Sequence, residues 1–163
     1  MPSSINLDTI STELTTNYLA YIHILKFVLP HLLPHTSVNS LIFTTSGLGL
    51  IPIPYCSTYA ASKAALHHLV LAMREQLKAT NTRVIEILPP AVRTEFHDDD
   101  HLLTINGRNI AMPLEEFVEE AWGGLCEGKT QIPIGRIEKC YETFEGKRQD
   151  MFQEMMRIIG EKS

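Results

Sequence analysis

Tyr59 and Lys63 are the two residues of this chain whose types and spacing most directly suggest chemistry. They lie four positions apart in a segment with a helical pattern, so both side chains lie on one helix face. An ammonium group beside a phenol favours the phenolate, because the opposite charge stabilises the ionised form. Moving a tyrosine pKa from about 10 to near neutrality takes about 4 kcal/mol, more than one solvated lysine supplies, so a second positive charge would help. The pair indicates proton transfer, and the alternative is an unrelated pair on a helix surface.

Ser46 lies 13 residues before Tyr59 and directly after a short apolar, β-branched segment, 40–45. Such a segment is typical of a parallel strand that is buried on both faces. A second segment of this kind, 83–88, is followed by the stretch 89–94. Ligands of open α/β sheets bind outside the carboxyl ends of the strands. We therefore expect these two strand ends and the Tyr59 helix face to meet at one crevice.

The elements that position these residues alternate between helix and strand. Helices are predicted over 7–33, about 57–79, 113 to about 126, and 138–160. Asp8 or Ser11 is the expected N-cap of the first helix, which Pro34 ends. A third, short strand is expected over 131–137, and 93–112 reads as a polar loop. Strands separated by helix-length segments imply right-handed βαβ units and a parallel sheet with helices on its faces.

Length and composition restrict the class of protein. The 163 residues predict a single domain over 1–163, and 44% hydrophobic with 20% charged residues is typical of a globular chain. The net charge of −5 argues against nucleic acid as a partner. No apolar run reaches the roughly 20 residues of a membrane span, and no signal peptide is recognisable. The cysteines, Cys56, Cys126 and Cys140, are odd in number and far apart, which favours reduced thiols in a cytoplasmic protein.

Several other patterns are interpreted as structural. Residues 97–101, His-Asp-Asp-Asp-His, read as a solvated loop, and no metal site is expected. His67 and His68 are neighbours on a helix and point apart, so a shared ligand role is not expected. Trp122, with Phe117 and Val118, is assigned to an ordinary core stripe, with a wall of a substrate pocket as the less favoured alternative. Arg148 is assigned to a solvated helix face.

Three segments together resemble the short-chain dehydrogenase/reductase family. They are Thr-Thr-Ser-Gly at 44–47, Tyr-Ala-Ala-Ser-Lys-Ala-Ala-Leu at 59–66, and Pro-Pro-Ala-Val-Arg-Thr at 89–94. The resemblance extends over about 7–140. Within the family, Met-Pro-Leu-Glu-Glu-Phe-Val from Met112 and Gln-Ile-Pro-Ile-Gly from Gln131 are similar to a DltE-like branch. The resemblance implies a doubly wound, Rossmann-type α/β fold, here truncated to about three strands flanked by helices.

The resemblance also implies a catalytic tetrad. Tyr59 would be the general acid in carbonyl reduction, or the base in alcohol oxidation. Lys63 would lower the pKa of Tyr59 and bind the nicotinamide ribose. Ser46 would hold and polarise the carbonyl. Asn17, on the first helix, would hold a water of a proton relay through the helix backbone.

The implied cofactor is NAD or NADP, and the implied substrate is a small carbonyl or alcohol compound. An oxidised nicotinamide ring would supply the second positive charge near Tyr59. Besides Tyr59 and Lys63, the cofactor-binding residues by resemblance are Pro89, Val92 through its backbone, and Thr94. The hydride chemistry would belong to the cofactor.

The chain departs from the family pattern in ways that open a second reading. It contains no Gly-rich dinucleotide fingerprint and no Asn-Asn-Ala-Gly stretch, and Pro90 stands where the family has glycine. It is expected to begin at the helix that precedes the family's fifth strand. One explanation is a truncated gene product or a missing upstream exon; the other is a catalytically silent remnant that acts as an oligomerisation or interaction module. A homo-oligomer through helices 7–33 and 57–79 is expected in either case, and the strand at 40–45 would leave one sheet edge bare.

Overall fold

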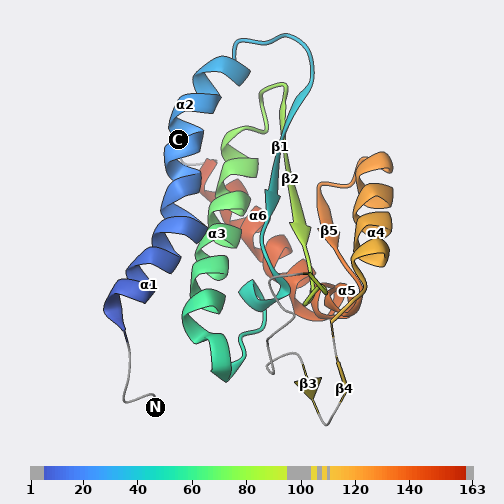
Figure 1. Ribbon diagram of the computed structural model, residues 1–163. Coiled ribbons are helices and arrows are strands. Elements are labelled where there is room, and N and C mark those ends of the chain that lie inside the picture. Colours follow the sequence, from blue (N-terminus) through green and yellow to red (C-terminus); the bar gives the residue numbers. More distant parts are fainter. Residues whose placement is uncertain (1–5, 95–103, 106–107, 110, 161–163) are drawn as a thin grey trace.

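The computed structural model describes residues 6–94, 104–105, 108–109 and 111–160. Its main sheet consists of β1 (Asn39–Thr44), β2 (Thr82–Leu88) and β5 (Gln131–Pro133), all parallel, in the order β1-β2-β5 (Figure 1). β2 is therefore the middle strand, and β1 is an edge in the described part of the chain. The prediction of a three-stranded parallel α/β sheet is confirmed.

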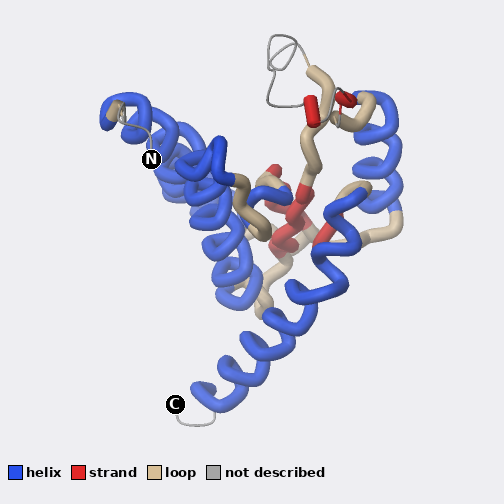
Figure 2. Tube along the Cα trace, turned by 90° about the horizontal axis from the view of Figure 1, so that it is seen from below, coloured by secondary structure: helices blue, strands red, loops and turns tan. Residues whose placement is uncertain are grey.

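The helices take up most of the remaining described chain. They are α1 (Leu7–Leu14), α2 (Ala20–Leu32), α3 (Ser57–Gln76), α4 (Leu114–Cys126), α5 (Arg136–Cys140) and α6 (Gly146–Gly160). A π-helical turn, Thr15–Leu19, joins α1 to α2, and a second one, Tyr141–Glu145, joins α5 to α6. The short strands β3 (Thr104–Ile105) and β4 (Arg108–Asn109) form an antiparallel pair within the region predicted as a loop. Figures 1 and 2 show α1, α2 and α3 on one side of the sheet and α4 on the other.

The first helix begins at Leu7, before either of the two residues that the sequence predicts as its N-cap. Asn6, rather than Asp8 or Ser11, is the N-cap: its side-chain oxygen accepts hydrogen bonds from the amides of Asp8, at 2.9 Å, and Thr9, at 3.3 Å. An Asn side chain at this position satisfies amides that have no partner within the helix. The helix ends at Leu32, close to the predicted boundary.

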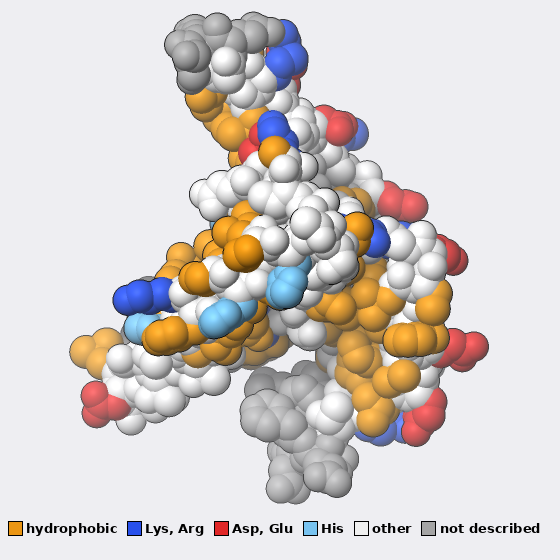
Figure 3. Space-filling view, turned by 90° about the horizontal axis from the view of Figure 1, so that it is seen from above, with side chains coloured by type: hydrophobic (Ala, Val, Ile, Leu, Met, Phe, Trp, Pro, Cys, Tyr) orange, Lys and Arg blue, Asp and Glu red, His pale blue; other side chains and the backbone are white. Residues whose placement is uncertain are grey.

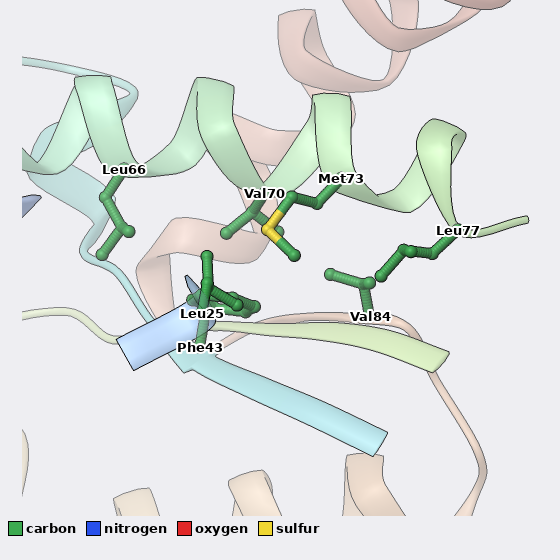
Figure 4. Packing of buried hydrophobic residues seen from close by; sticks show 7 residues of the cluster. All are labelled: Leu25, Phe43, Leu66, Val70, Met73, Leu77 and Val84. Carbon is green, nitrogen blue, oxygen red and sulfur yellow. The ribbon is translucent and has the colours of Figure 1, made fainter. Parts of the chain in front are cut away.

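Two hydrophobic clusters hold the helices on the sheet, one on each face. On the α3 side, Leu66, Val70, Met73 and Leu77 pack against Leu25 of α2 and against Phe43 and Val84 of the sheet (Figure 4). On the other side, Ile85 and Ile87 of β2 pack against Ala121 of α4 and Ile132 of β5. The alternation along β2 follows from the two-residue repeat of a strand.

The prediction that the first strand is buried on both faces is wrong. Phe43 is buried against α3, but Ile42, which points to the other face, is 50% exposed. The assignment of Trp122 to the core is also wrong, because α4 turns Phe117 and Ala121 toward the sheet and leaves Trp122 66% exposed. Figure 3 shows hydrophobic side chains gathered on the side of the molecule where α4 lies.

A buried charged cluster joins the last helices to α3 and β2. The two ring nitrogens of His67 contact two carboxylates, Glu86 at 2.7 Å through Nδ1 and Glu145 at 3.0 Å through Nε2. All three residues are at most 1% exposed. Arg148 donates to Glu145 from Nε, at 2.8 Å, and from Nη2, at 2.9 Å. The interpretation of Arg148 as part of a solvated face is therefore wrong, because its guanidinium group reaches back to the cluster.

This cluster shifts the pKa values of His67 and Glu145 in opposite directions. Burial by itself lowers the pKa of His67, but the hydrogen bonds and charges of Glu145 and Glu86 outweigh it and raise that pKa from 6.5 to about 9. Burial by itself raises the pKa of Glu145, but hydrogen bonds from His67, Arg148 and Gln149 outweigh it and lower that pKa to about 2. The raised pKa favours an imidazolium whose two N–H groups donate to the carboxylates, and the Arg148 Nη2 atom, which lies 2.5 Å from Nε2, opposes this charged form.

Leu66→Ala should lower the free energy of unfolding by about 3 kcal/mol, because Leu66 is fully buried at the centre of the α3 cluster and its loss leaves a cavity. Urea denaturation measures the change. Met151→Ala, at a position that is 72% exposed, is the control and should change the value by less than about 0.5 kcal/mol. Equal effects of the two variants would contradict the assigned core.

The free energy of unfolding should fall by about 3 kcal/mol as the pH rises from about 6.5 through 9. The folded pKa of His67 is raised, so its stabilisation is complete below the unfolded value of 6.5 and is lost above the folded value. The pKa of Glu145 is lowered, so the stabilisation that its carboxylate provides is lost as the pH falls from 4.5 to about 2. Urea denaturation at a series of pH values measures both losses.

Glu145→Gln is the matched control for this pH dependence. It keeps the shape of the side chain and removes one of the two carboxylates that hold the proton on His67, so the alkaline loss should shrink and start at lower pH. An unfolding free energy that is constant over this alkaline range in the unmodified chain would refute the protonated state of His67.

Candidate functional site

Ser46 lies close enough to Tyr59, at the carboxyl end of β1, to lower the pKa of the phenol. Ser46 follows the strand in an extended conformation and is buried. Its hydroxyl oxygen accepts a hydrogen bond from the amide of Leu48, at 3.1 Å. Tyr59 is half-buried in the first turn of α3. The strand end and the helix start thus present two hydroxyl groups to one another.

Lys63 lies one turn along α3 and is held against the same strand end. Its Nζ atom donates to the carbonyl oxygen of Thr44, at 3.2 Å, and lies 5.7 Å from the centre of the Tyr59 ring. The turn after Ser46 packs directly on this part of the helix: a Cβ atom at Gly49 would lie 3.0 Å from the carbonyl oxygen of Lys63. A glycine at this position therefore permits the close approach of the turn to α3.

Asn17 reaches the site through the backbone of α3. It lies in the π-helical turn between α1 and α2, and its side-chain amide donates to the hydroxyl of Ser62, at 3.1 Å. Ser62 in turn donates to the carbonyl oxygen of Tyr59, at 2.7 Å. Single π-helical turns within α-helices are frequent at functional sites. Asn17 thus holds the helix start that carries Tyr59.

The stretch after β2 runs beside the same strand end. The amide of Gly47 donates to the carbonyl oxygen of Pro89, at 2.9 Å, which continues the pairing of β1 with β2. Val92 pairs with Met112 through the backbone of its neighbours, so its own N–H and C=O groups point to the opposite side. Thr94 is half-buried two residues further on. No hydrogen bond joins Val92 or Thr94 to Tyr59 or Lys63 among the described residues.

Burial dominates the electrostatics of the site. It raises the pKa of Tyr59 above 10, and the nearby Ser46 side chain lowers it only in part. Burial also lowers the pKa of Lys63. The Tyr59 side chain is therefore a protonated phenol at neutral pH, able to donate a proton. The lowering of the Tyr59 pKa by Lys63 stays a prediction.

The contacts that Thr45, Glu86 and His67 make next to Ser46 were not predicted from the sequence. Thr45, the residue before it, donates to Glu86, and Glu86 contacts His67 on α3. His67 comes four residues after Lys63, one helical turn away, and this spacing was the available signal. Glu86 was a further signal, because it is the single charged residue in the otherwise apolar segment 84–88.

Two further expectations concern metals and membranes. Residues 97–101, with their two histidines and three aspartates, lie outside the described part of the chain. In the described residues, no cluster of three or more potential metal ligands is found. No helix in those same ranges is long and apolar enough to cross a membrane.

Sequence comparisons agree with the geometry. The family model for short chain dehydrogenases matches residues 1–101. The uncharacterized oxidoreductase DltE of Bacillus subtilis is 33% identical over 146 residues, which cover 88% of this chain and 56% of DltE. An NADPH-dependent 1-acyldihydroxyacetone phosphate reductase of Saccharomyces cerevisiae is 36% identical over 60 residues, 37% of this chain and 20% of the reductase. The matched part of this chain thus spans about half the length of DltE and a smaller share of the yeast reductase.

Solved structures show the same fold. A short-chain dehydrogenase of Sphingobium yanoikuyae in complex with NADPH matches with a TM-score of 0.76 at 22% identity, over 91% of this chain and 58% of that one. A short-chain dehydrogenase of Burkholderia cenocepacia in complex with NADP matches with a TM-score of 0.73 at 19% identity, over 94% and 63%. On the family model and the identity to DltE, this chain belongs to the short-chain dehydrogenase/reductase family.

Proposed function

We propose that the chain carries the catalytic half of an NAD(P)-dependent oxidoreductase that interconverts a small carbonyl compound and an alcohol. The observation that carries the proposal is the meeting of Ser46, Tyr59 and Lys63 at one strand end. Three polar side chains from two elements, one of them a phenol with a shifted pKa, are typical of an acid–base site. Family membership supports the reaction class.

The residues have separate roles in this proposal. Tyr59 holds the proton: the phenol is protonated at neutral pH and would donate this proton to a carbonyl oxygen. Because burial raises the pKa of Tyr59, which makes the phenol a weaker acid, the donation would need a positive charge nearby. Ser46 donates a hydrogen bond to the same oxygen and orients it. Lys63 places a positive charge near the ring, and Asn17 fixes the start of α3 through Ser62.

The described residues fit one half of a dinucleotide cofactor. The backbone N–H and C=O groups of Val92 are not used in its bridge to Met112, and this donor and acceptor would match a nicotinamide carboxamide. Lys63, Pro89 and Thr94 are the other residues that we assign to the cofactor. The adenosine half has no counterpart, because the chain has no Gly-rich strand–turn–helix motif. When bound, the cofactor supplies the hydride chemistry. The related structures that contain NADP or NADPH make NADPH the first cofactor to test.

The alternative is a catalytically silent module that binds other copies of the chain or a partner protein. Two observations favour it: the described part of the chain leaves β1 at the sheet edge with Ile42 half exposed, and α2 exposes Ile24 and Phe27 to 58% and 68%. Exposed strand edges invite pairing with another chain. A cytoplasmic location is part of both proposals, and the unpaired thiols of Cys126 and Cys140 agree with it.

NADPH should bind the purified chain saturably, with the heat measured by titration calorimetry, and a panel of aldehydes and ketones should be reduced. Tyr59→Phe should keep the binding and lower turnover at least about a hundredfold, because the proton donor is lost and the ring stays. Tyr55→Phe, four residues earlier and 79% exposed, is the matched control and should leave turnover unchanged. Absence of binding at millimolar NADPH would refute the catalytic proposal for this chain. The catalytically silent module would then be the remaining proposal.

Phe27→Glu should shift the chain from dimer to monomer, because it places a charge on the exposed apolar face of α2 that we assign to contact between copies. Analytical ultracentrifugation measures the change. Met151→Glu makes the same kind of substitution at an exposed position of α6 and should leave the sedimentation unchanged. Identical sedimentation of Phe27→Glu and the unmodified chain would exclude this face as the interface.

A further inference from the structure

One oxygen atom of Glu86 receives hydrogen bonds from two different elements. Thr45 donates from its hydroxyl to Oε1, at 2.7 Å, and His67 donates from Nδ1 to the same atom, at 2.7 Å. Glu86 is fully buried in the middle strand, and Thr45 is 2% exposed. The end of β1, the middle of β2 and the second half of α3 thus meet at one atom.

Two residues of this network are close in sequence to residues of the candidate site. Ser46 comes directly after Thr45, and Lys63 lies one helical turn before His67. The two elements that carry the Ser46–Tyr59 pair are therefore cross-linked from behind by side chains, in addition to the contact of Lys63 with Thr44. Side chains that support a site from behind in this way hold its reacting groups in their productive geometry.

We propose that the Thr45–Glu86–His67 network is a positioning device that holds Ser46, and the turn that follows it, against the part of α3 that carries Tyr59 and Lys63. The proposal rests on the proposed function only in identifying Ser46 and Tyr59 as the reacting pair. Thr45, Glu86 and His67 are positioning residues: none of them touches Tyr59, and each acts through the backbone next to it. Glu145 and Arg148 complete the device by holding the second nitrogen of His67 from the last helices.

Fold stability alone is a poor explanation for this arrangement. Buried ion pairs are often matched or exceeded in stability by apolar side chains of similar volume. The neighbours of Glu86 on β2 are apolar, and an apolar residue would pack against α3 as Val84 does. The polar network differs from an apolar contact in having directional bonds, which determine where the strand end lies relative to the helix.

Thr45→Val tests the device, because it removes the hydroxyl and keeps the β-branched shape. The reporter is hydrogen exchange of the Leu48 amide, which is bonded to the Ser46 hydroxyl, measured by NMR at neutral pH. We expect this amide to exchange about tenfold faster, while amides in the middle of β2 change less than about twofold. The carbon-13 shift of the Tyr59 Cζ atom, assigned with Tyr59→Phe, should move at the same time, because the Ser46 hydroxyl, which influences the phenol, changes its position.

Two matched variants separate positioning from general effects of the substitution. Thr45→Ser keeps the hydroxyl and should restore the slow exchange of Leu48. Thr82→Val makes the same substitution at a buried β2 threonine whose hydroxyl has no hydrogen-bond partner among the described residues, and Leu48 should stay protected. If Thr45→Val does not fold, Thr45→Cys supplies the same test, because a thiol is only a weak donor.

Unchanged Leu48 exchange in the folded Thr45 variant overturns the proposal. A uniform acceleration of all amides overturns it as well, because that would be a loss of global stability without local release. The measurement needs no cofactor and no substrate. A chain that fails to bind NADPH but shows the local release would therefore refute the proposed function and keep the positioning role.

Discussion

The side chain of Glu86 lies in the middle strand, where water does not reach it, so its oxygen atoms depend on donors from within the chain. Thr45 and His67 contact Oε1 from the end of β1 and from α3, while Oε2 has no hydrogen-bond partner among the described residues. These directional contacts restrict where the end of β1 can lie relative to α3. The geometry around Ser46, Tyr59 and Lys63 depends on that constraint.

Parallel pairing explains why the candidate site lies where it does. β1 and β2 run in the same direction, so Ser46 and the stretch after Leu88 leave the sheet at the same edge, and α3 returns across the face that Phe43 covers. The start of α3 then brings Tyr59 to Ser46. Burial at this position raises the pKa of Tyr59 and keeps the phenol protonated at neutral pH.

The described chain is also notable for the apolar surface that it leaves uncovered. Ile42 on β1 and Trp122 on α4 are half exposed or more, and they lie on the face of the sheet opposite α3. The relative DltE is nearly twice as long as the matched region. The catalytic and the silent proposals differ in what covers this surface and in whether the adenosine half of a cofactor has a platform. The contacts of Ser46, Lys63 and Asn17 are the same under both proposals, because they are made within the chain.

Local patterns in the sequence were enough to predict the three parallel strands, the four long helical segments and the group Ser46, Tyr59 and Lys63, because apolar periodicity and motif spacing are local properties. Predictions of burial from these patterns were wrong for Trp122, for Arg148 and for the exposed face of β1, since burial depends on which elements pack together. The Thr45–Glu86–His67 network joins residues that are 41 and 19 positions apart. A contact over such separations exists only after the sheet and α3 have assembled. The sequence by itself therefore determined which groups are available for chemistry, and the tertiary structure decided what holds them in place and which of them are protonated, because both depend on burial and on distant partners.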